Sequence, residues 1–262
     1  MSETHSDSVE YGPQIRYKSC IVFEKTKISY VIWFEDALRH YGVPTALFDL
    51  YILLLDLGTA ANALVHAGWA MDTQSPHRIA DAVVEIPQRP LISPDKRTKT
   101  VLLLASDWRF PLASNPPLEC VPIMDQLSSS ELAYPQLPAL LDALIESWLA
   151  GPSDDDKLLL CLSCYVNYIY DHVPGVKVGS FAGKVKYEHR QLHADIIAGM
   201  ESSTLPFRNY QRGIREGLLQ SRYELQECSA SRDNKVLFVN WESIRLPDPV
   251  RYEESSHSDC ED

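Results

Sequence analysis

Four arginines in the last third of the chain are spaced so that one helix would present them together. They stand at i, i+4, i+7 and i+14 and are Arg208, Arg212, Arg215 and Arg222. At 3.6 residues per turn this spacing places them in one narrow stripe. The stripe can bind phosphate, an acidic partner or the chain's own acidic tail, and Arg208, Arg212 and Arg215 are the candidate phosphate ligands. The alternative is a solvated face, which charge stripes on helices usually are.

A second basic group precedes these arginines and contains two histidines, His189 and His193, with Lys184, Lys186 and Arg190 around them. Two histidines four residues apart on a helix have the spacing of zinc ligands. No third ligand stands at a matching distance, so zinc binding is the weaker interpretation.

Two cysteines, Cys161 and Cys164, form a Cys-x-x-Cys pair inside the apolar run of residues 158–169. A redox pair needs a helix N-terminus to lower the thiol pKa, and a zinc site needs a second pair at the right spacing. The apolar surroundings instead predict buried structural cysteines inside a helix.

The composition is that of an ordinary globular protein, with 45% apolar and 23% charged residues among 262. The first residues form no signal peptide, and no apolar run is long enough to span a bilayer. We therefore predict a cytoplasmic or nuclear protein with no membrane partner.

The net charge of −12 is concentrated at the two ends of the chain. Residues 1–14 carry three acids, and residues 248–262 carry six acids against one arginine. We predict a disordered arm at residues 1–14 and an acidic disordered tail at residues 247–262. The remaining body is mildly acidic, which speaks against nucleic acid as a partner.

Alternating apolar runs and Gly/Pro stops predict an α/β domain at residues 15–125, with a mixed sheet and flanking helices. Strands are expected at residues 29–33, 46–55, 79–86 and 99–105, and helices at residues 35–41 and 56–67. The first of these helices should end at Gly42, before Pro44, and the second at Gly68. Residues 87–97, 111–122 and 135–138 are expected to be connecting segments.

Helical periodicity dominates the rest of the chain and predicts a helical module at residues 130–230. The expected helices are residues 139–149, 157–170, 181–200 and 211–228. They are separated by Gly151-Pro152, Pro174-Gly175 and Pro206.

The segment of residues 28–69 carries a specific order of motifs. A strand at 30–33 and a helix at 36–41 lead to Gly42-Val43-Pro44-Thr45, then Asp49 and Tyr51 two residues apart, and a helix closed by Gly68-Trp69. This order resembles the minimal nucleotidyltransferase family, which includes nucleotidylating toxins and antitoxins of bacteria and related uncharacterised fungal proteins.

The resemblance implies a metal site that this sequence only partly retains. In the family, two carboxylates two residues apart on a strand hold divalent cations against a nucleoside triphosphate, behind a Gly-Gly turn. Here Asp49 has Tyr51 as its partner, and Phe34-Glu35 stands at the Gly-Gly position. A third acid is expected on the later strand, and Asp107 is the nearest candidate.

Two interpretations of these residues remain. An active protein would use Glu35, Asp49 and Asp107 as a rebuilt catalytic site, with Asp49 as the metal ligand and Mg²⁺ as the cofactor. Otherwise Glu35 and Asp36 cap a helix, Asp49 is hydrogen-bonded at a strand end, and there is no cofactor. Three departures within one site favour the second interpretation.

The leading functional hypothesis is a catalytically degenerate nucleotidyltransferase-fold protein that binds or regulates a protein partner or a small molecule. The alternative is a divergent metal-dependent enzyme that transfers nucleotidyl or phosphoryl groups. A third hypothesis, an accessory protein of a fungal biosynthetic pathway, comes from the fungal relatives alone.

Overall fold

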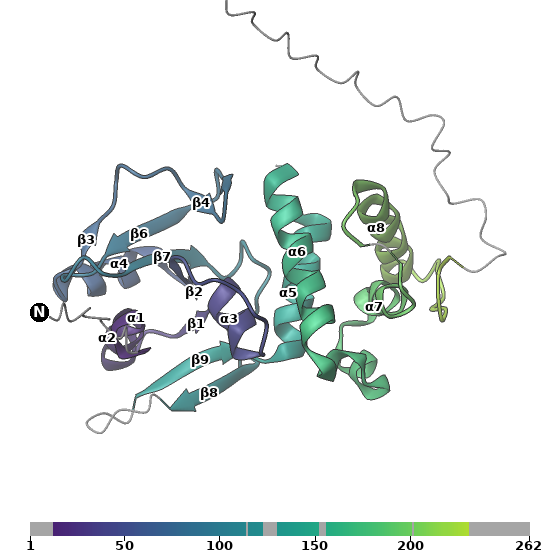
Figure 1. Ribbon diagram of the computed structural model, residues 1–262, viewed down its shortest axis with the longest axis horizontal. Coiled ribbons are helices and arrows are strands. Elements are labelled where there is room, and N and C mark those ends of the chain that lie inside the picture. The colour runs from purple at the N-terminus through teal and green to yellow at the C-terminus, as the bar shows by residue number, and fades with distance from the viewer. Residues whose placement is uncertain (1–12, 114, 123–129, 152–155, 201, 231–262) are drawn as a thin grey trace, which may run out of the picture. The chain divides into compact units, whose positions relative to one another are not determined.

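A computed structural model describes residues 13–113, 115–122, 130–151, 156–200 and 202–230 (Figure 1). The described residues up to Ser229 form one compact unit. The predicted acidic tail and residues 1–12 of the predicted arm lie outside the described residues, whereas Pro13–Arg16 form the short helix α1. The division into an α/β domain and a helical module stays a prediction.

A five-stranded mixed sheet organises the N-terminal half, with strand order β1-β2-β7-β6-β3. Strands β2 and β7 are parallel, and the other neighbouring pairs are antiparallel. The bounds are Tyr30–Ile32 for β1, Leu50–Leu54 for β2, Ala70–Met71 for β3, Gln88–Ile92 for β6 and Lys99–Leu104 for β7. The predicted α/β class, with a mixed sheet and flanking helices, is confirmed.

Helices cover one face of this sheet. Helix α4 (Leu57–His66) packs on β6 and β7, and α2 (Lys18–Thr26) packs on α4 (Figure 1). Thr100 of β7 donates to Ser19 of α2 at 3.2 Å, so Thr100 points to the helical face. Because side chains alternate along a strand, Lys99 and Val101 point to the opposite face.

Helix α3 (Phe34–His40) connects β1 to β2 and ends where the sequence predicts. Gly42 follows it with φ +89°, a left-handed conformation that glycine adopts without steric cost. Helix α4 also begins where expected, because Asp56 accepts the backbone N–H of Gly58 at 2.8 Å.

The predicted strand at residues 79–86 is wrong. This stretch contains only part of a small hairpin, β4 (Arg78–Ile79) and β5 (Ala82–Val83). Strand β6, which pairs with β7 in the sheet, lies in residues 87–97, the segment predicted to be a connection. Pro90 obscured it, but the Pro90 carbonyl accepts the N–H of Asp72 at 2.9 Å, so the missing proline N–H does not prevent strand pairing.

The Pro-rich segments predicted as loops are also partly wrong, because they contribute to a hairpin of β8 (Leu118–Pro122) and β9 (Glu131–Pro135). Pro122 and Pro135 stand at the strand ends, where proline is tolerated. Tyr30 of β1 donates to the Glu131 carbonyl at 2.9 Å, and β9 therefore packs beside β1 (Figure 1).

The C-terminal half is helical, as predicted. Helix α5 (Leu137–Ala150) and helix α6 (Asp156–His172) match two of the expected helices. The long helix predicted at residues 181–200 is wrong. Three short 3-10 segments, η1 (Pro174–Lys177), η2 (Gly179–Lys184) and η3 (Tyr187–His189), lead into α7 (Arg190–Ile197). Gly179 and Gly183 lower the helix propensity there.

Helix α8 (Leu205–Leu219) begins earlier and ends earlier than predicted. Pro206 lies in the first turn of this helix and does not interrupt it, because a proline there lacks only an N–H that would be unpaired anyway. The Thr204 hydroxyl accepts the Phe207 N–H at 3.3 Å and caps the helix. Among the described helices, none is long and apolar enough to cross a membrane.

Candidate functional site

The sheet face opposite α4 forms the floor of a cavity. Tyr51 of β2, Val101 of β7 and Pro90 of β6 are register partners and lie side by side across three strands. Asp49 and Lys99 stand two residues before Tyr51 and Val101, so they share the same face. The period-two alternation of the strands therefore puts two charged side chains beside this apolar floor.

The cavity has a volume of about 540 Å³, within the range that small-molecule sites occupy. Its walls come from α3, from the hairpin of β4 and β5, and from the start of β6. Besides the three floor residues together with Asp49 and Lys99, it is lined by Glu35, Phe48, Ser75, Pro76, Arg78, Ala80, Asp81 and Gln88.

At one end of the cavity, Lys99 neutralises two carboxylates. Its ammonium lies 3.9 Å from an oxygen of Asp49 and 3.0 Å from an oxygen of Asp72. Burial raises the pKa of Asp49, and the charges of Lys99 and Arg16 oppose that effect. A protein ammonium thus supplies the positive charge next to Asp49.

Tyr51 stands two residues after Asp49, where the resemblance leads us to look for a second carboxylate. Its ring is buried, and its hydroxyl donates to the Arg78 carbonyl at 3.3 Å. Burial raises the pKa of this phenol, so it stays protonated at neutral pH. The Tyr51 side chain therefore ties the hairpin to the sheet.

Glu35 is a buried acid at the wall of the cavity, with 3% of its surface exposed. One carboxylate oxygen, Oε1, accepts a hydrogen bond from the Tyr165 hydroxyl of α6. The other oxygen, Oε2, has no hydrogen-bond partner within the described part of the chain. Burial raises the pKa of Glu35 more than the Tyr165 hydrogen bond lowers it.

Phe34 precedes Glu35 and has a left-handed backbone, with φ +49°. This conformation costs on the order of 1–3 kcal/mol in a residue other than glycine. The buried ring contacts Tyr51, Trp108 and Tyr165 at centroid distances of 5.2, 4.8 and 5.4 Å. The resemblance assigns glycine to the position of Phe34. Phe34 has the backbone conformation that suits glycine, and its aromatic contacts hold it there.

The predicted capping role of Glu35 and Asp36 is wrong, because α3 has Trp33 at its N-cap and no side-chain cap hydrogen bond. Asp36 instead forms two hydrogen bonds with Arg16, at 2.7 and 2.6 Å. Arg16 also donates to the carbonyls of Phe48 and Asp49, at 2.9 and 3.2 Å. Arg16 therefore fixes the chain just before β2, including the backbone of Asp49.

The third predicted catalytic acid, Asp107, is placed apart from this cavity. It lies in the turn after β7 and does not line the cavity that Glu35 and Asp49 share. Within the described ranges, no three His, Cys, Asp or Glu side chains are placed so that they could hold a metal ion together. The structure therefore brings together two of the three predicted carboxylates.

The arginines of the predicted stripe point to different surroundings. Arg208 is buried and donates to the carbonyls of Trp148 and Leu149 at the end of α5, at 2.6 and 3.4 Å. Arg215 forms an ion pair with Glu146. Arg212 is exposed on α8, and Arg222 follows the end of that helix.

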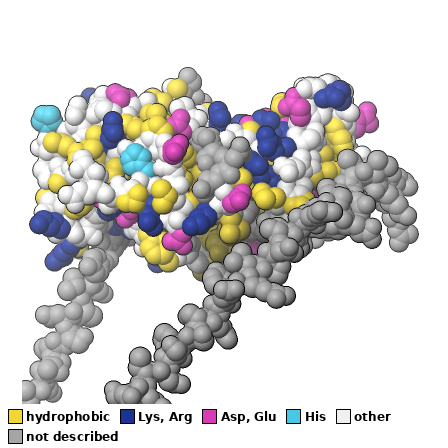
Figure 2. All heavy atoms as spheres, turned by 90° about the horizontal axis from the view of Figure 1, so that it is seen from above, with side chains coloured by type: hydrophobic (Ala, Val, Ile, Leu, Met, Phe, Trp, Pro, Cys, Tyr) yellow, Lys and Arg dark blue, Asp and Glu magenta, His cyan; other side chains and the backbone are white. Residues whose placement is uncertain are grey.

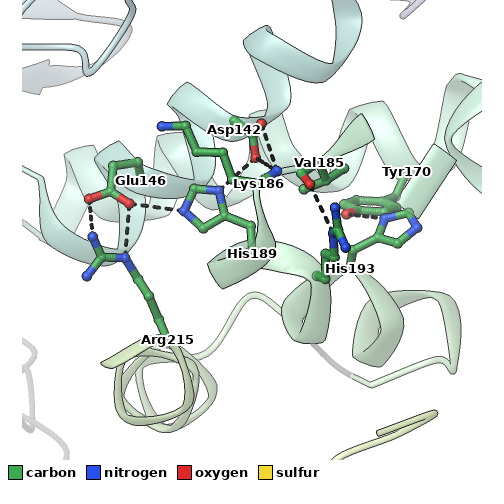
Figure 3. Close-up of polar contacts among 9 residues, drawn as sticks. Asp142, Glu146, Tyr170, Val185, Lys186, His189, His193 and Arg215 are labelled. Atoms are coloured by element: carbon green, nitrogen blue, oxygen red, sulfur yellow. Dashed lines mark hydrogen bonds and ion pairs between the residues drawn. The ribbon is translucent and has the colours of Figure 1, made fainter. Parts of the chain in front are cut away.

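The two histidines of the second basic group bind separate protein partners (Figure 3). The His189 ring is fully buried between Asp142 at 2.7 Å and Glu146 at 3.0 Å. Burial lowers the His189 pKa, but the hydrogen bonds to the two carboxylates outweigh it and raise the pKa. His193 Nδ1 lies 2.9 Å from the Tyr170 hydroxyl. The pair thus shares no common ligand position.

Cys161 and Cys164 lie in the middle of α6 as free thiols of intermediate exposure, so they are in a helix as predicted but are less buried than predicted. Burial raises the pKa of the Cys161 thiol to about 11. That direction disfavours the reactive thiolate.

Sequence reasoning singled out Glu35 and Asp49 but missed Lys99, Arg78, Gln88 and Phe48. Period-two alternation of the strand at residues 99–105 places Lys99 and Val101 on one face. It does not reveal that this strand pairs with β2, which is what brings Lys99 to Asp49.

Comparisons with known proteins give few matches: no protein-family model and no curated protein matches the sequence. Among solved structures, JHP933 from Helicobacter pylori is 11% identical with a TM-score of 0.36, covering 78% of this chain and 90% of that chain. A second H. pylori structure, whose name assigns it to the nucleotidyltransferases, is 10% identical and has the same TM-score. The match covers 78% of this chain and 92% of that chain. At this TM-score the likeness decides nothing about the site or the activity.

Proposed function

We propose that this protein binds a small molecule in the cavity of a degenerate nucleotidyltransferase-like fold and acts as a binding or regulatory protein without metal-dependent catalysis. The observation that carries the proposal is the position of Lys99 between Asp49 and Asp72. The Lys99 ammonium lies beside the carboxylate oxygens of Asp49 and Asp72. A catalytic metal at Asp49 would need to take the place of this ammonium.

Ligand chemistry supports this interpretation. Mg²⁺ needs a nearly octahedral set of carboxylate, phosphate and water oxygens. Here Asp49 faces an ammonium, and the protonated Tyr51 hydroxyl is turned to the Arg78 carbonyl. A divalent ion would have to displace Lys99 and gain little from the phenol.

The surroundings of the cavity also disfavour a triphosphate. The Phe34 ring fills the turn where a phosphate would need close backbone approach, and Glu35 follows it directly. A buried carboxylate at that point repels an anionic ligand. The net charge of −12 supports a small-molecule or protein partner over nucleic acid, although Lys and Arg side chains gather in the right half of the face drawn in Figure 2.

The alternative, a metal-dependent nucleotidyl- or phosphoryl-transferring enzyme, requires Glu35, Asp49 and Asp107 to act together. Asp107 does not line the cavity of the other two, which makes this the weaker hypothesis. The role as an accessory protein of a biosynthetic pathway rests on the fungal resemblance alone.

Binding of Mn²⁺, followed through the paramagnetic relaxation of water protons, tests the role of Lys99. We expect no binding to the native chain at millimolar Mn²⁺. Lys99→Ala should gain binding, because Asp49 and Asp72 lose their shared cation. Lys18→Ala is the matched control, since Lys18 pairs with the single carboxylate of Asp95 at 2.7 Å.

Thermal unfolding with each of the four nucleoside triphosphates, with and without Mg²⁺ or Mn²⁺, tests the absence of metal-dependent nucleotide binding. A ligand at 100 times its dissociation constant stabilises a protein by about 2.7 kcal/mol. We expect no metal-dependent shift. A shift with one nucleotide, or tight Mn²⁺ binding to the native chain, would overturn the proposal in favour of the enzyme.

A further inference from the structure

The cavity has two ends with opposite states of charge pairing. At the end near Asp49, the Lys99 ammonium pairs with two carboxylates. The other end lies against α6 and holds Glu35 and Asp81. Glu35 accepts a hydrogen bond from the Tyr165 hydroxyl of α6, and Asp81 directly precedes β5. Contacts between β5 and α6 agree with this placement of Asp81.

Among the residues that the structure describes, no lysine or arginine pairs with the carboxylates at the α6 end. Within the described part of the chain, neither Glu35 nor Asp81 forms an ion pair, and Glu35 Oε2 has no hydrogen-bond partner. Arg16, which lowers the pKa of Glu35 from a distance, is bound to Asp36. Buried carboxylates in proteins are normally paired, so Glu35 Oε2 is an acceptor that a group from outside the chain can use.

Apolar surface lies between the two ends of the cavity. Tyr51, Val101 and Pro90 form the floor, and Phe48 stands beside them with 70% of its surface exposed. An aromatic ring that is exposed at a cavity can cover the apolar body of a ligand. The cavity thus offers an apolar surface that leads to an anionic end.

We propose that the cavity binds a small organic ammonium ion, in which a primary amine on an apolar body pairs with Glu35 Oε2 beside Asp81. This inference rests on the proposed function, because it names the class of ligand for the same cavity. The two proposals rest on different residues. The absence of a catalytic metal is argued from Lys99, and the amine site is argued from Glu35 and Asp81 at the other end of the cavity.

Two probes of matched shape test the charge preference. Phenethylamine carries an ammonium at neutral pH, and 2-phenylethanol carries a neutral hydroxyl on the same body. Titration of the full chain, followed by nuclear magnetic resonance, should show that the amine binds about tenfold or more tightly than the alcohol, as expected for a charge-assisted hydrogen bond. Equal affinities, or no binding of the amine, would overturn the proposal.

Glu35→Gln separates an ionic contact from a neutral hydrogen bond. Glutamine keeps the shape and can still accept the Tyr165 hydroxyl hydrogen bond, but it carries no charge. We expect the amine to lose about tenfold in affinity while the alcohol is unaffected. Glu24→Gln, an exposed change on α2, is the control and should alter neither. Unchanged amine binding in Glu35→Gln would exclude Glu35 as the ionic partner.

Asp81→Asn keeps the test decisive if Glu35→Gln does not fold, because Asp81 is exposed in the hairpin. We expect a smaller loss of amine affinity, about twofold to fivefold, from the weaker Coulomb interaction of an exposed carboxylate. No loss in this variant would contradict the proposed position of the ammonium. A failed amine test, with Mn²⁺ still excluded by Lys99, would leave the proposed function intact.

Discussion

The cavity and the His189 cluster each contain a buried titratable side chain, Glu35 and His189, yet the pairing of these two groups differs. In the cluster, His189 bonds to Asp142 and Glu146, Glu146 pairs with Arg215, and Asp142 accepts the N–H of Lys186 at 3.1 Å (Figure 3). In the cavity, Glu35 keeps one oxygen without a partner. The comparison separates a closed structural network from a cavity in which one buried acceptor is left without a protein partner among the described residues.

Residue types that suggest chemistry have to be interpreted together with the partners that the fold gives them. Two histidines at metal-ligand spacing and a stripe of arginines are the more conspicuous sequence signals. His189 and Arg215 nevertheless act in the same closed network, whereas Glu35 shows the unsatisfied burial that points to function.

The largest expected effect is the loss of His189 from the closed network. His189→Leu removes the group that both carboxylates contact, and losing one partner of a buried ion pair costs about 3–5 kcal/mol. Chemical unfolding should show a loss near the lower figure, because Glu146 keeps Arg215. His172→Leu, an exposed change on α6, should stay within about 0.5 kcal/mol. Equal stability of the two variants would contradict the structural role of the network.

The next largest effect is a difference in stability loss between substitutions of two arginines on α8, the buried Arg208 and the exposed Arg212. Arg208→Met leaves the carbonyls of Trp148 and Leu149 without their donor, and we expect a loss of about 2 kcal/mol in the free energy of unfolding. Arg212→Met, the exposed control, should stay within about 0.5 kcal/mol. Inorganic phosphate that binds the native chain and is lost equally in both variants would instead favour the predicted phosphate site.

The smallest effect is a pH dependence that distinguishes the two regions. Glu35 and His189 both have raised pKa values in the folded chain, so each contributes stability at low pH that is lost as the pH rises through the folded pKa. The Glu35 loss begins near its ordinary value of 4.5, and the His189 loss begins near 6.5. Tyr165 donates to Glu35, and burial raises the pKa of Tyr165, Tyr51 and Cys161, so these groups titrate at much higher pH.

Measuring the free energy of unfolding from pH 4 to pH 8 checks this prediction. Glu35→Gln should lack the decline that starts near pH 4.5 and keep the one that starts near pH 6.5. Retention of the low-pH decline in this variant would show that another group causes it.

Much of the N-terminal fold was predictable because its signals are local. The continuous apolar run before Asp56 indicates a strand that is covered on both faces, and Gly42 and Gly68 mark where two helices end. Strand β6 escaped prediction because Pro90 resembles a break, and β3 because two residues carry no periodicity. Pro206 was misread as a break, since its effect depends on whether it stands inside a helix or at its start.

The candidate site was only half predictable. Glu35 and Asp49 were found because carboxylates near a strand–helix–strand motif suggest chemistry. Lys99 was missed because its importance depends on the pairing of β7 with β2, which no local pattern encodes. Tyr165 was missed for the same reason, since it lies 130 residues from Glu35 in the sequence.

By itself, the sequence determined the α/β class, the two helices that flank β2 and the chemical types at the motif from Phe34 to Tyr51. These depend on periodicity and turn residues, which act within a few residues of the chain. Only the tertiary structure decided which charges are paired: Lys99 with Asp49, Arg16 with Asp36, and His189 with two carboxylates. Charge pairing depends on distances across strands and helices, and those distances exist only once the elements have packed.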